Sequence, residues 1–132
     1  MTDIQTTTVS KEGFVTTNEI GDAEVTIDAT GETAPTANAV LVSTYAACFL
    51  PAFRVGGRQR GQDELGKVQI DAEGDLDDDD DLEAIRFRIH VEADLDDETF
   101  EAIVARAEDI CHVHAALRPE LQADISVVGG AF

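Results

Sequence analysis

Residues 37–55 read ANAVLVSTYAACFLPAFRV, and this stretch decides the expected fold. Arg54 is the only charged residue in it, so a helix formed here is apolar on every side. Such a helix is buried inside a protein, because no face of it favours water. We therefore expect a buried central helix that carries Cys48 near its middle, bends at Pro51 and ends at the Gly-Gly pair that follows.

Short alternating runs before and after this helix are typical of β-strands. Thr- and Val-rich segments separated by turn-like residues precede the helix, and further alternating runs follow it. The expected strands are residues 4–10, 14–20, 23–30, 67–72, 84–91 and 124–128. With a second helix before the last strand, the order is β-β-β-α-β-β-α-β, which predicts an α+β fold with a mostly antiparallel sheet. We expect residues 1–132 to form a single domain.

The second helix is the clearest element in the sequence. Asp96 is a natural N-cap, and Asp97 and Glu98 follow it near the positive end of the helix dipole. Apolar residues then recur at helical spacing and form one stripe, made of Phe100, Ile103, Val104, Ala107, Ile110 and Cys111. The pattern places Cys111 on the buried face, at the end of this helix.

The charge of the chain is strongly negative. Its 28 acidic residues outnumber nine Lys and Arg, which gives a formal net charge of −19. Such a surface repels phosphate backbones and anionic lipids, so we expect no nucleic-acid or membrane partner. At molar salt the screening length falls to roughly 3 Å, and the acidic, lysine-poor composition therefore indicates halophilic adaptation. The alternative is an acidic surface that binds one basic partner.

The sequence also indicates a compartment. No basic and apolar segment of the signal-peptide type opens the chain. The longest apolar run, Val40 to Phe53, is about 14 residues long and too short to span a bilayer. Two cysteines without a secretory signal indicate a reducing compartment, where a thiol pair is more often redox-active than structural. We therefore expect a cytoplasmic protein whose chemistry depends on Cys48 and Cys111.

A reactive thiol requires a nearby cation or base, because the thiolate is the nucleophile. Arg54, Arg58 and Arg60 follow the Cys48 helix closely and can supply such a cation. A solvated loop that balances the local acidic charge is the competing interpretation.

The three histidines are His90, His112 and His114. Two of them lie in the run Cys-His-Val-His, whose spacing matches no strong zinc signature. We expect surface or capping histidines and no metal site.

The segment Tyr45-Ala46-Ala47-Cys48-Phe49, at the centre of an apolar helix, resembles the first cysteine motif of the OsmC/Ohr family (osmotically inducible protein C, organic hydroperoxide resistance). Cys111, at the end of an amphipathic helix and before a short strand, resembles the second cysteine of that family. The spacing of the cysteines and the order of the elements agree along nearly the whole chain. With its acidic composition, the sequence resembles a haloarchaeal member of the family.

The resemblance implies an intertwined homodimer with two active sites at the subunit interface. It also implies thiol-dependent reduction of organic hydroperoxides without a bound cofactor. Cys48 is then the peroxidatic thiolate, Cys111 the resolving thiol, and a dithiol the reductant. On the same interpretation Arg54 assists Cys48. The substrate contacts are then Tyr45, Phe49 and Asn38.

The sequence departs from the family pattern at three places. The family's Asn-Pro-Glu reads Thr36-Ala37-Asn38, no arginine precedes Arg54, and the second motif's Cys-Pro is Cys111-His112. In the family's enzymes an Arg–Glu pair orients and charges the thiolate. The departures therefore keep an alternative open, a non-enzymatic dimer that senses redox state or binds a small ligand in an apolar pocket near Cys48.

Overall fold

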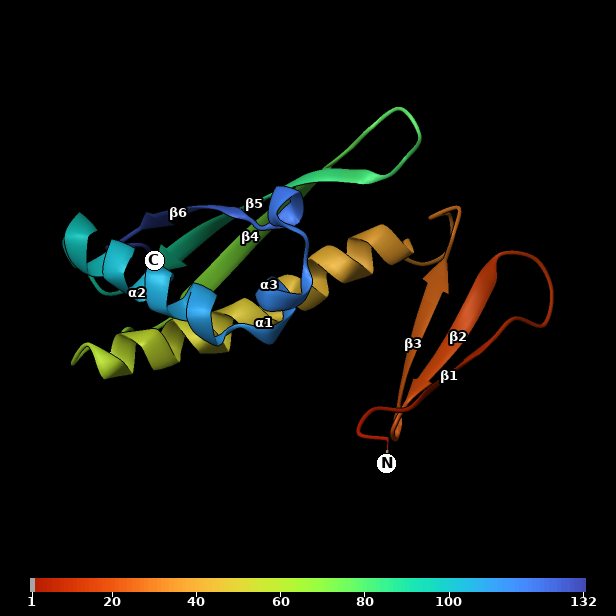
Figure 1. Ribbon diagram of the computed structural model, residues 1–132, viewed down its shortest axis with the longest axis horizontal. Helices are drawn as coiled ribbons and strands as arrows, with labels where there is room; N and C mark the ends of the chain where they lie inside the picture. The colour runs from red at the N-terminus through yellow and green to blue at the C-terminus, as the bar shows by residue number, and fades with distance from the viewer. Residues whose placement is uncertain (1) are drawn as a thin grey trace. The chain divides into compact units, whose positions relative to one another are not determined.

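The computed structural model describes residues 2–132, and its elements follow the expected order (Figure 1). The chain forms two compact units, one ending at Leu41 and the other running from Val42 to Phe132. Each unit holds one three-stranded sheet. The α+β class is confirmed, with the strands divided between two sheets. A single domain over the whole length stays a prediction.

The first unit is built on an antiparallel meander of β1 (Thr6–Val9), β2 (Val15–Ile20) and β3 (Ala23–Asp28). The side chain of Asn18 links the strands, since its Nδ2 donates to the Val25 carbonyl at 3.0 Å. Among residues 2–41, Asp28 has the only buried side chain. This sheet therefore has no apolar core of its own.

Asp28 organises the loop that leads from β3 to the first helix. Its carboxylate accepts hydrogen bonds from the main-chain N–H and hydroxyl of Thr30, at 2.9 and 2.7 Å. It also accepts from the N–H and hydroxyl of Thr33, at 3.0 and 2.9 Å. These bonds, with the Thr30 hydroxyl the largest cause, hold the pKa of Asp28 far below its ordinary value.

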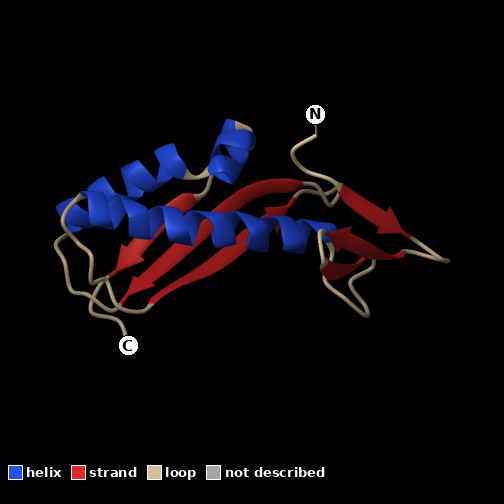
Figure 2. Cartoon of the chain, turned by 90° about the horizontal axis from the view of Figure 1, so that it is seen from below, coloured by secondary structure: helices blue, strands red, loops and turns tan. Residues whose placement is uncertain are grey.

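The second unit contains the longer sheet, made of β4 (Val68–Leu76), β5 (Leu82–Val91) and β6 (Asp124–Val128). The central strand β5 pairs antiparallel with β4 and parallel with β6. The parallel pair exists because the chain crosses back through helices between β5 and β6. Figure 2 shows the helices of this unit lying along the sheet.

Helix α1 (Ala37–Gln59) supplies most of the aromatic core of the second unit. Its buried positions share one face and are Tyr45, Phe49, Ala52, Phe53, Gly56 and Gly57. The ring centroids of Tyr45 and Phe49 lie 4.6 and 5.6 Å from that of Phe87 on β5. The helix is 23 residues long and, by length and composition alone, apolar enough to cross a membrane. The apolar run from Val40 to Phe53 is shorter, and the sequence therefore did not predict this length. Its packed face makes it the core helix of the fold.

The expected end of α1 at the glycine pair is wrong, because the helix continues to Gln59. A Cβ on Gly56 would lie 2.9 Å from the carbonyl oxygen of Ile103 in helix α2 (Asp97–Ile110). A Cβ on Gly57 would lie 3.0 Å from Leu65. The glycines therefore allow close approach of neighbouring segments and do not stop the helix.

Helix α2 begins as expected, since the Asp96 carboxylate accepts from the N–H of Thr99 at 2.7 Å. Cys111 is buried at the end of this helix, as expected, where it forms the C-cap and does not continue the helix. Cys111 has extended backbone angles, φ −68° and ψ 113°, and separates α2 from the short helix α3 (His112–Ala116). A 3₁₀ turn (Pro119–Leu121) then leads to β6.

Candidate active site at Cys48 and Cys111

Cys48 lies on the inner side of α1, one turn after Tyr45. Residues three and four apart lie on the same face of a helix, so Tyr45, Cys48 and Phe49 point toward the same region. Tyr45 and Phe49 are fully buried, whereas Cys48 is half-buried at the edge of the core. The helix therefore holds the Cys48 thiol between the packed interior and the surface.

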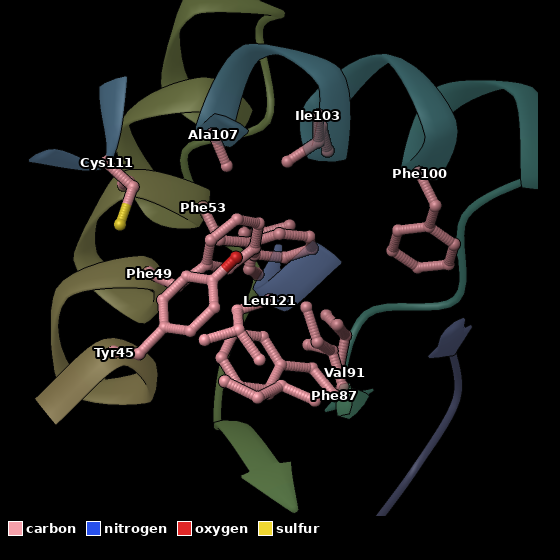
Figure 3. Packing of buried hydrophobic residues seen from close by; sticks show 14 of the residues in the cluster. Tyr45, Phe49, Phe53, Phe87, Val91, Phe100, Ile103, Ala107, Cys111 and Leu121 are labelled. Carbon is pink, nitrogen blue, oxygen red and sulfur yellow. The ribbon is translucent and has the colours of Figure 1, made fainter. Parts of the chain in front are cut away.

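Cys111 lies at the junction of α2 and α3. Its N–H donates to the Ala107 carbonyl at 2.9 Å and closes α2. Its Sγ accepts from the N–H of His114 at 3.4 Å and caps α3. Figure 3 shows the sulfur of Cys111 pointing toward α1, from which Tyr45, Phe49 and Phe53 come.

The two thiols are free, and each shifts the pKa of the other. The N–H of Val113 is the largest cause that lowers the pKa of Cys48. The Cys111 thiol and the N–H of His112 lower it further, against the opposing effect of partial burial. These donors stabilise a thiolate on Cys48, and a low pKa makes more of that nucleophile available near neutral pH.

Cys111 behaves in the opposite way. Burial is the largest cause that raises its pKa, and the neighbouring Cys48 raises it further. Of the two thiols, Cys48 is therefore the one that ionises more readily, and Cys111 is the one that keeps its proton to higher pH.

The aromatic residues expected to contact substrate face the interior. Phe49 packs in the core, with its ring centroid 6.4 Å from that of Tyr45. The Tyr45 hydroxyl lies 2.6 Å from Nδ1 of His114. Asn38 lies in the first turn of α1, in the first unit. Their role as substrate contacts stays a prediction.

Arg54 does not join the thiol pair in the structure of this chain. Its guanidinium donates to the Gly66 carbonyl at 2.8 Å. A residue six positions after Cys48 is turned by roughly 240° about the helix axis and displaced by about 9 Å along it. The groups that lower the pKa of Cys48 are main-chain N–H groups and a thiol, and a role for Arg54 beside Cys48 stays a prediction.

The functional residue that sequence reasoning missed is His114. It is buried, with 8% of its surface exposed, and contacts Tyr45 through its ring and Cys111 through its main chain. His112 is exposed and contributes its N–H to Cys48. The run Cys-His-Val-His contained both residues, but nothing in it separates the buried histidine from the exposed one. Across residues 2–132, no group of three or more His, Cys, Asp or Glu side chains is arranged to hold a metal ion.

Fold and site together define an α+β protein with an asymmetric pair of thiols between two helices. A sequence model of the family described as OsmC-like protein matches residues 15–126. The chain belongs to this OsmC-like family, as its first cysteine motif predicted.

A relative of high identity comes from a haloarchaeon. An uncharacterized protein of the haloarchaeon Haloferax volcanii is 64% identical over 132 residues and is matched over 100% of both chains. This relative is consistent with the haloarchaeal character expected from the composition.

Solved structures show the same fold at low sequence identity. An organic hydroperoxide resistance protein OsmC of Legionella pneumophila has a TM-score of 0.74 at 20% identity, over 96% of this chain and 97% of that one. The organic hydroperoxide resistance protein OhrB of Bacillus subtilis has a TM-score of 0.71 at 18% identity, over 96% and 98%. An OsmC-like protein of Mycoplasma pneumoniae has a TM-score of 0.79 at 18% identity, over 97% and 96%.

Proposed function

We propose that this protein reduces organic hydroperoxides with Cys48 as the attacking thiolate and Cys111 as the resolving thiol. The observation that carries the proposal is the placement of two free thiols together, Cys48 on α1 and Cys111 at the junction of α2 and α3, in surroundings that lower the pKa of Cys48 and raise that of Cys111. The family, and neighbours named for organic hydroperoxide resistance, support a function connected with peroxides.

The chemistry has three balanced steps. The Cys48 thiolate attacks one oxygen of ROOH, the O–O bond breaks, and with one proton an alcohol leaves and a sulfenic acid remains. The Cys111 sulfur then attacks the Cys48 sulfur, the S–O bond breaks, and the hydroxyl leaves as water with the Cys111 proton. A dithiol finally reduces the disulfide, regenerates both thiols and becomes a disulfide itself.

The test is turnover of cumene hydroperoxide with dihydrolipoate as reductant, in molar KCl. We expect Cys48→Ser to abolish peroxide consumption. Cys111→Ser should leave a sulfenate on Cys48 that a dimedone probe traps, and the unaltered protein should form an intrachain disulfide after peroxide alone. Consumption that persists in Cys48→Ser would overturn the proposal.

A second function is favoured by the position of Arg54. Because its guanidinium is bound to Gly66 and the Cys48 thiolate is stabilised by neutral donors, oxidation can be slow enough for sensing rather than turnover. A disulfide that forms after stoichiometric peroxide, without turnover by excess dithiol, would favour this redox-sensing role.

We also propose that the protein acts as a homodimer in the cytoplasm. Exposed apolar side chains in the first unit and the outer side of α1 support this: Val9, Phe14, Val15, Ile20 and Leu41 are 37 to 70% exposed. Apolar surface of this kind is typical of the interfaces of obligate dimers. Light scattering in molar KCl should give twice the mass of the chain, and a stable folded monomer would contradict the proposal.

A further inference from the structure

Two polar side chains, Tyr45 and His114, lie in the otherwise apolar core next to the thiols. Tyr45 is 0% and His114 8% exposed. The Tyr45 oxygen lies 2.6 Å from Nδ1 of His114 and accepts from the N–H of Ala123 at 3.0 Å. A buried hydroxyl and imidazole without partners would be costly, so this arrangement satisfies both groups.

The direction of these hydrogen bonds follows from their chemistry. The Ala123 N–H can only donate, so it occupies a lone pair on the Tyr45 oxygen. The hydroxyl proton is then free to go to Nδ1 of His114, which places the ring proton of the neutral imidazole on Nε2. Nε2 lies 3.7 Å from a carboxylate oxygen of Glu108, which favours that tautomer. Tyr45 and His114 are thus locked in one orientation.

The main chain of His114 connects the Tyr45–His114 hydrogen bond to the thiols. Its N–H donates to Cys111 Sγ at 3.4 Å, and its carbonyl accepts from the side chain of Gln122 at 3.2 Å. The N–H groups of the two residues between Cys111 and His114 are the main-chain groups that lower the pKa of Cys48. The turn from Cys111 to His114 therefore lies beside the Cys48 thiol, and the His114 ring anchors the turn in the core.

We propose that Tyr45 and His114 are positioning residues whose buried hydrogen bond holds the turn Cys111–His114 against the sulfur of Cys48. Tyr45 lies one turn before Cys48 on the same helix, so the bond fixes the donors and the thiol relative to one rigid element. Neither residue touches the reacting sulfur of Cys48 in this assignment. The inference rests on the proposed role of Cys48 as the reactive thiol.

The test measures the thiolate of Cys48 and does not depend on peroxide turnover. Iodoacetamide alkylation is followed from about pH 5 to about pH 10 in molar KCl, on folded protein. Mass spectrometry resolves the two cysteines, because Arg54 and Arg106 put them on different tryptic peptides. The other titratable groups around the site are Cys111, Tyr45, His114 and Glu108. The curve of alkylation rate against pH is therefore fitted with a titration midpoint for each of these groups as well as for Cys48.

Tyr45→Phe keeps the ring in the core and removes only the hydroxyl. We expect the midpoint for Cys48 alkylation to rise by about one pH unit, which is a roughly tenfold lower thiolate fraction below both midpoints. His114→Leu should give the same rise. His114→Asn should keep the original midpoint, because the Asn side-chain oxygen can accept the Tyr45 proton in place of Nδ1.

His90→Leu is the matched control, since His90 also pairs with a carboxylate, Asp71, at 3.0 Å, but between β4 and β5. It should leave the Cys48 midpoint unchanged. An unchanged midpoint in folded His114→Leu would overturn the inference, and so would an equal rise in His114→Asn. A rise in His114→Leu alone supports the inference even if Tyr45→Phe does not fold. Lack of peroxide turnover together with these shifts would contradict the proposed function but not the positioning role.

Discussion

The unit that ends at Leu41 and the unit that begins at Val42 have nearly the same charge per residue but very different interiors. Seven acidic residues against Lys11 give −6 in the first 41 residues, and 21 against eight give −13 in the other 91. All buried apolar side chains of residues 2–132 lie between Tyr45 and Leu121. Three strands require an apolar face or a packed helix for independent stability. The first unit therefore has no apolar core of its own, whereas the second has one.

The largest expected difference is in the free energy of unfolding, between alanine substitutions of two phenylalanines, one in each unit. Phe53 is 0% and Phe14 70% exposed. We expect Phe53→Ala to lower the free energy of unfolding by about 3–5 kcal/mol, through lost burial and a cavity. Because Phe14 is exposed within the chain, Phe14→Ala should change it by less than about 0.5 kcal/mol beyond any contribution of the proposed dimer interface. Denaturant unfolding in molar KCl measures both. A loss for Phe14→Ala that depends on protein concentration would show that a second copy covers this residue.

Close packing in the second unit gives the next prediction. Gly56→Ala puts a methyl group 2.9 Å from the Ile103 carbonyl oxygen, where α1 and α2 meet. We expect a loss of about 1–3 kcal/mol, because the helices must separate. An alanine in an open helix position would instead stabilise the protein by up to about 1 kcal/mol. The sign of the change, from thermal or denaturant unfolding, therefore decides whether the contact is as tight as the structure has it.

Lowering the salt concentration should destabilise the first unit before the second. Lowering KCl from molar to about 0.1 M extends the screening length from roughly 3 to about 10 Å, which increases repulsion among carboxylates. Since the first unit has equal charge density and no core, we expect amides of β1–β3 to lose exchange protection first, followed by those of residues 42–132. Melting temperature should rise with KCl. Simultaneous loss of protection in both units, or a melting temperature independent of salt, would contradict this order.

The smallest effect concerns Asp28, the one buried side chain of the first unit. Its pKa in the folded protein is lowered from the ordinary value of 3.8, so the stability it contributes is fully present above that value and is lost as the pH falls below it. Asp28→Asn should therefore speed amide exchange at Thr30 and Thr33 near neutral pH. The difference should shrink in acid. Asp22→Asn, at the exposed β2–β3 turn, should show neither effect.

The order of the main elements and the family could be predicted because both depend on local patterns. The apolar run around Cys48 and the capped, striped helix after Asp96 each occupy one segment of the chain. The confirmed family followed from the motif at residues 45–49 together with Cys111, the spacing of the two cysteines and the order of the elements. Patterns of this kind report burial and periodicity without reference to distant residues.

The features that the sequence did not predict depend on contacts between distant segments. The glycine pair looked like a helix end. Position 56 instead requires glycine because the Ile103 carbonyl oxygen lies too close for a side chain. The break at Cys111 needs no proline or glycine, because a cysteine sulfur caps the next turn. His114 is separated from Tyr45 by 69 residues, and no local pattern links the two. For the same reason the sequence could not predict that main-chain N–H groups and the Cys111 thiol lower the pKa of Cys48.

Tyr45 is the only tyrosine of a chain that has no tryptophan. Excitation near 280 nm is therefore absorbed almost entirely by a single phenol one helical turn from Cys48. Because a hydrogen bond to imidazole and a nearby disulfide both quench phenol emission, the unlabelled protein contains its own optical reporter of the thiol pair. Fluorescence intensity recorded during stopped-flow mixing with a hydroperoxide would then follow oxidation and reduction at the site in real time, without a coupled assay.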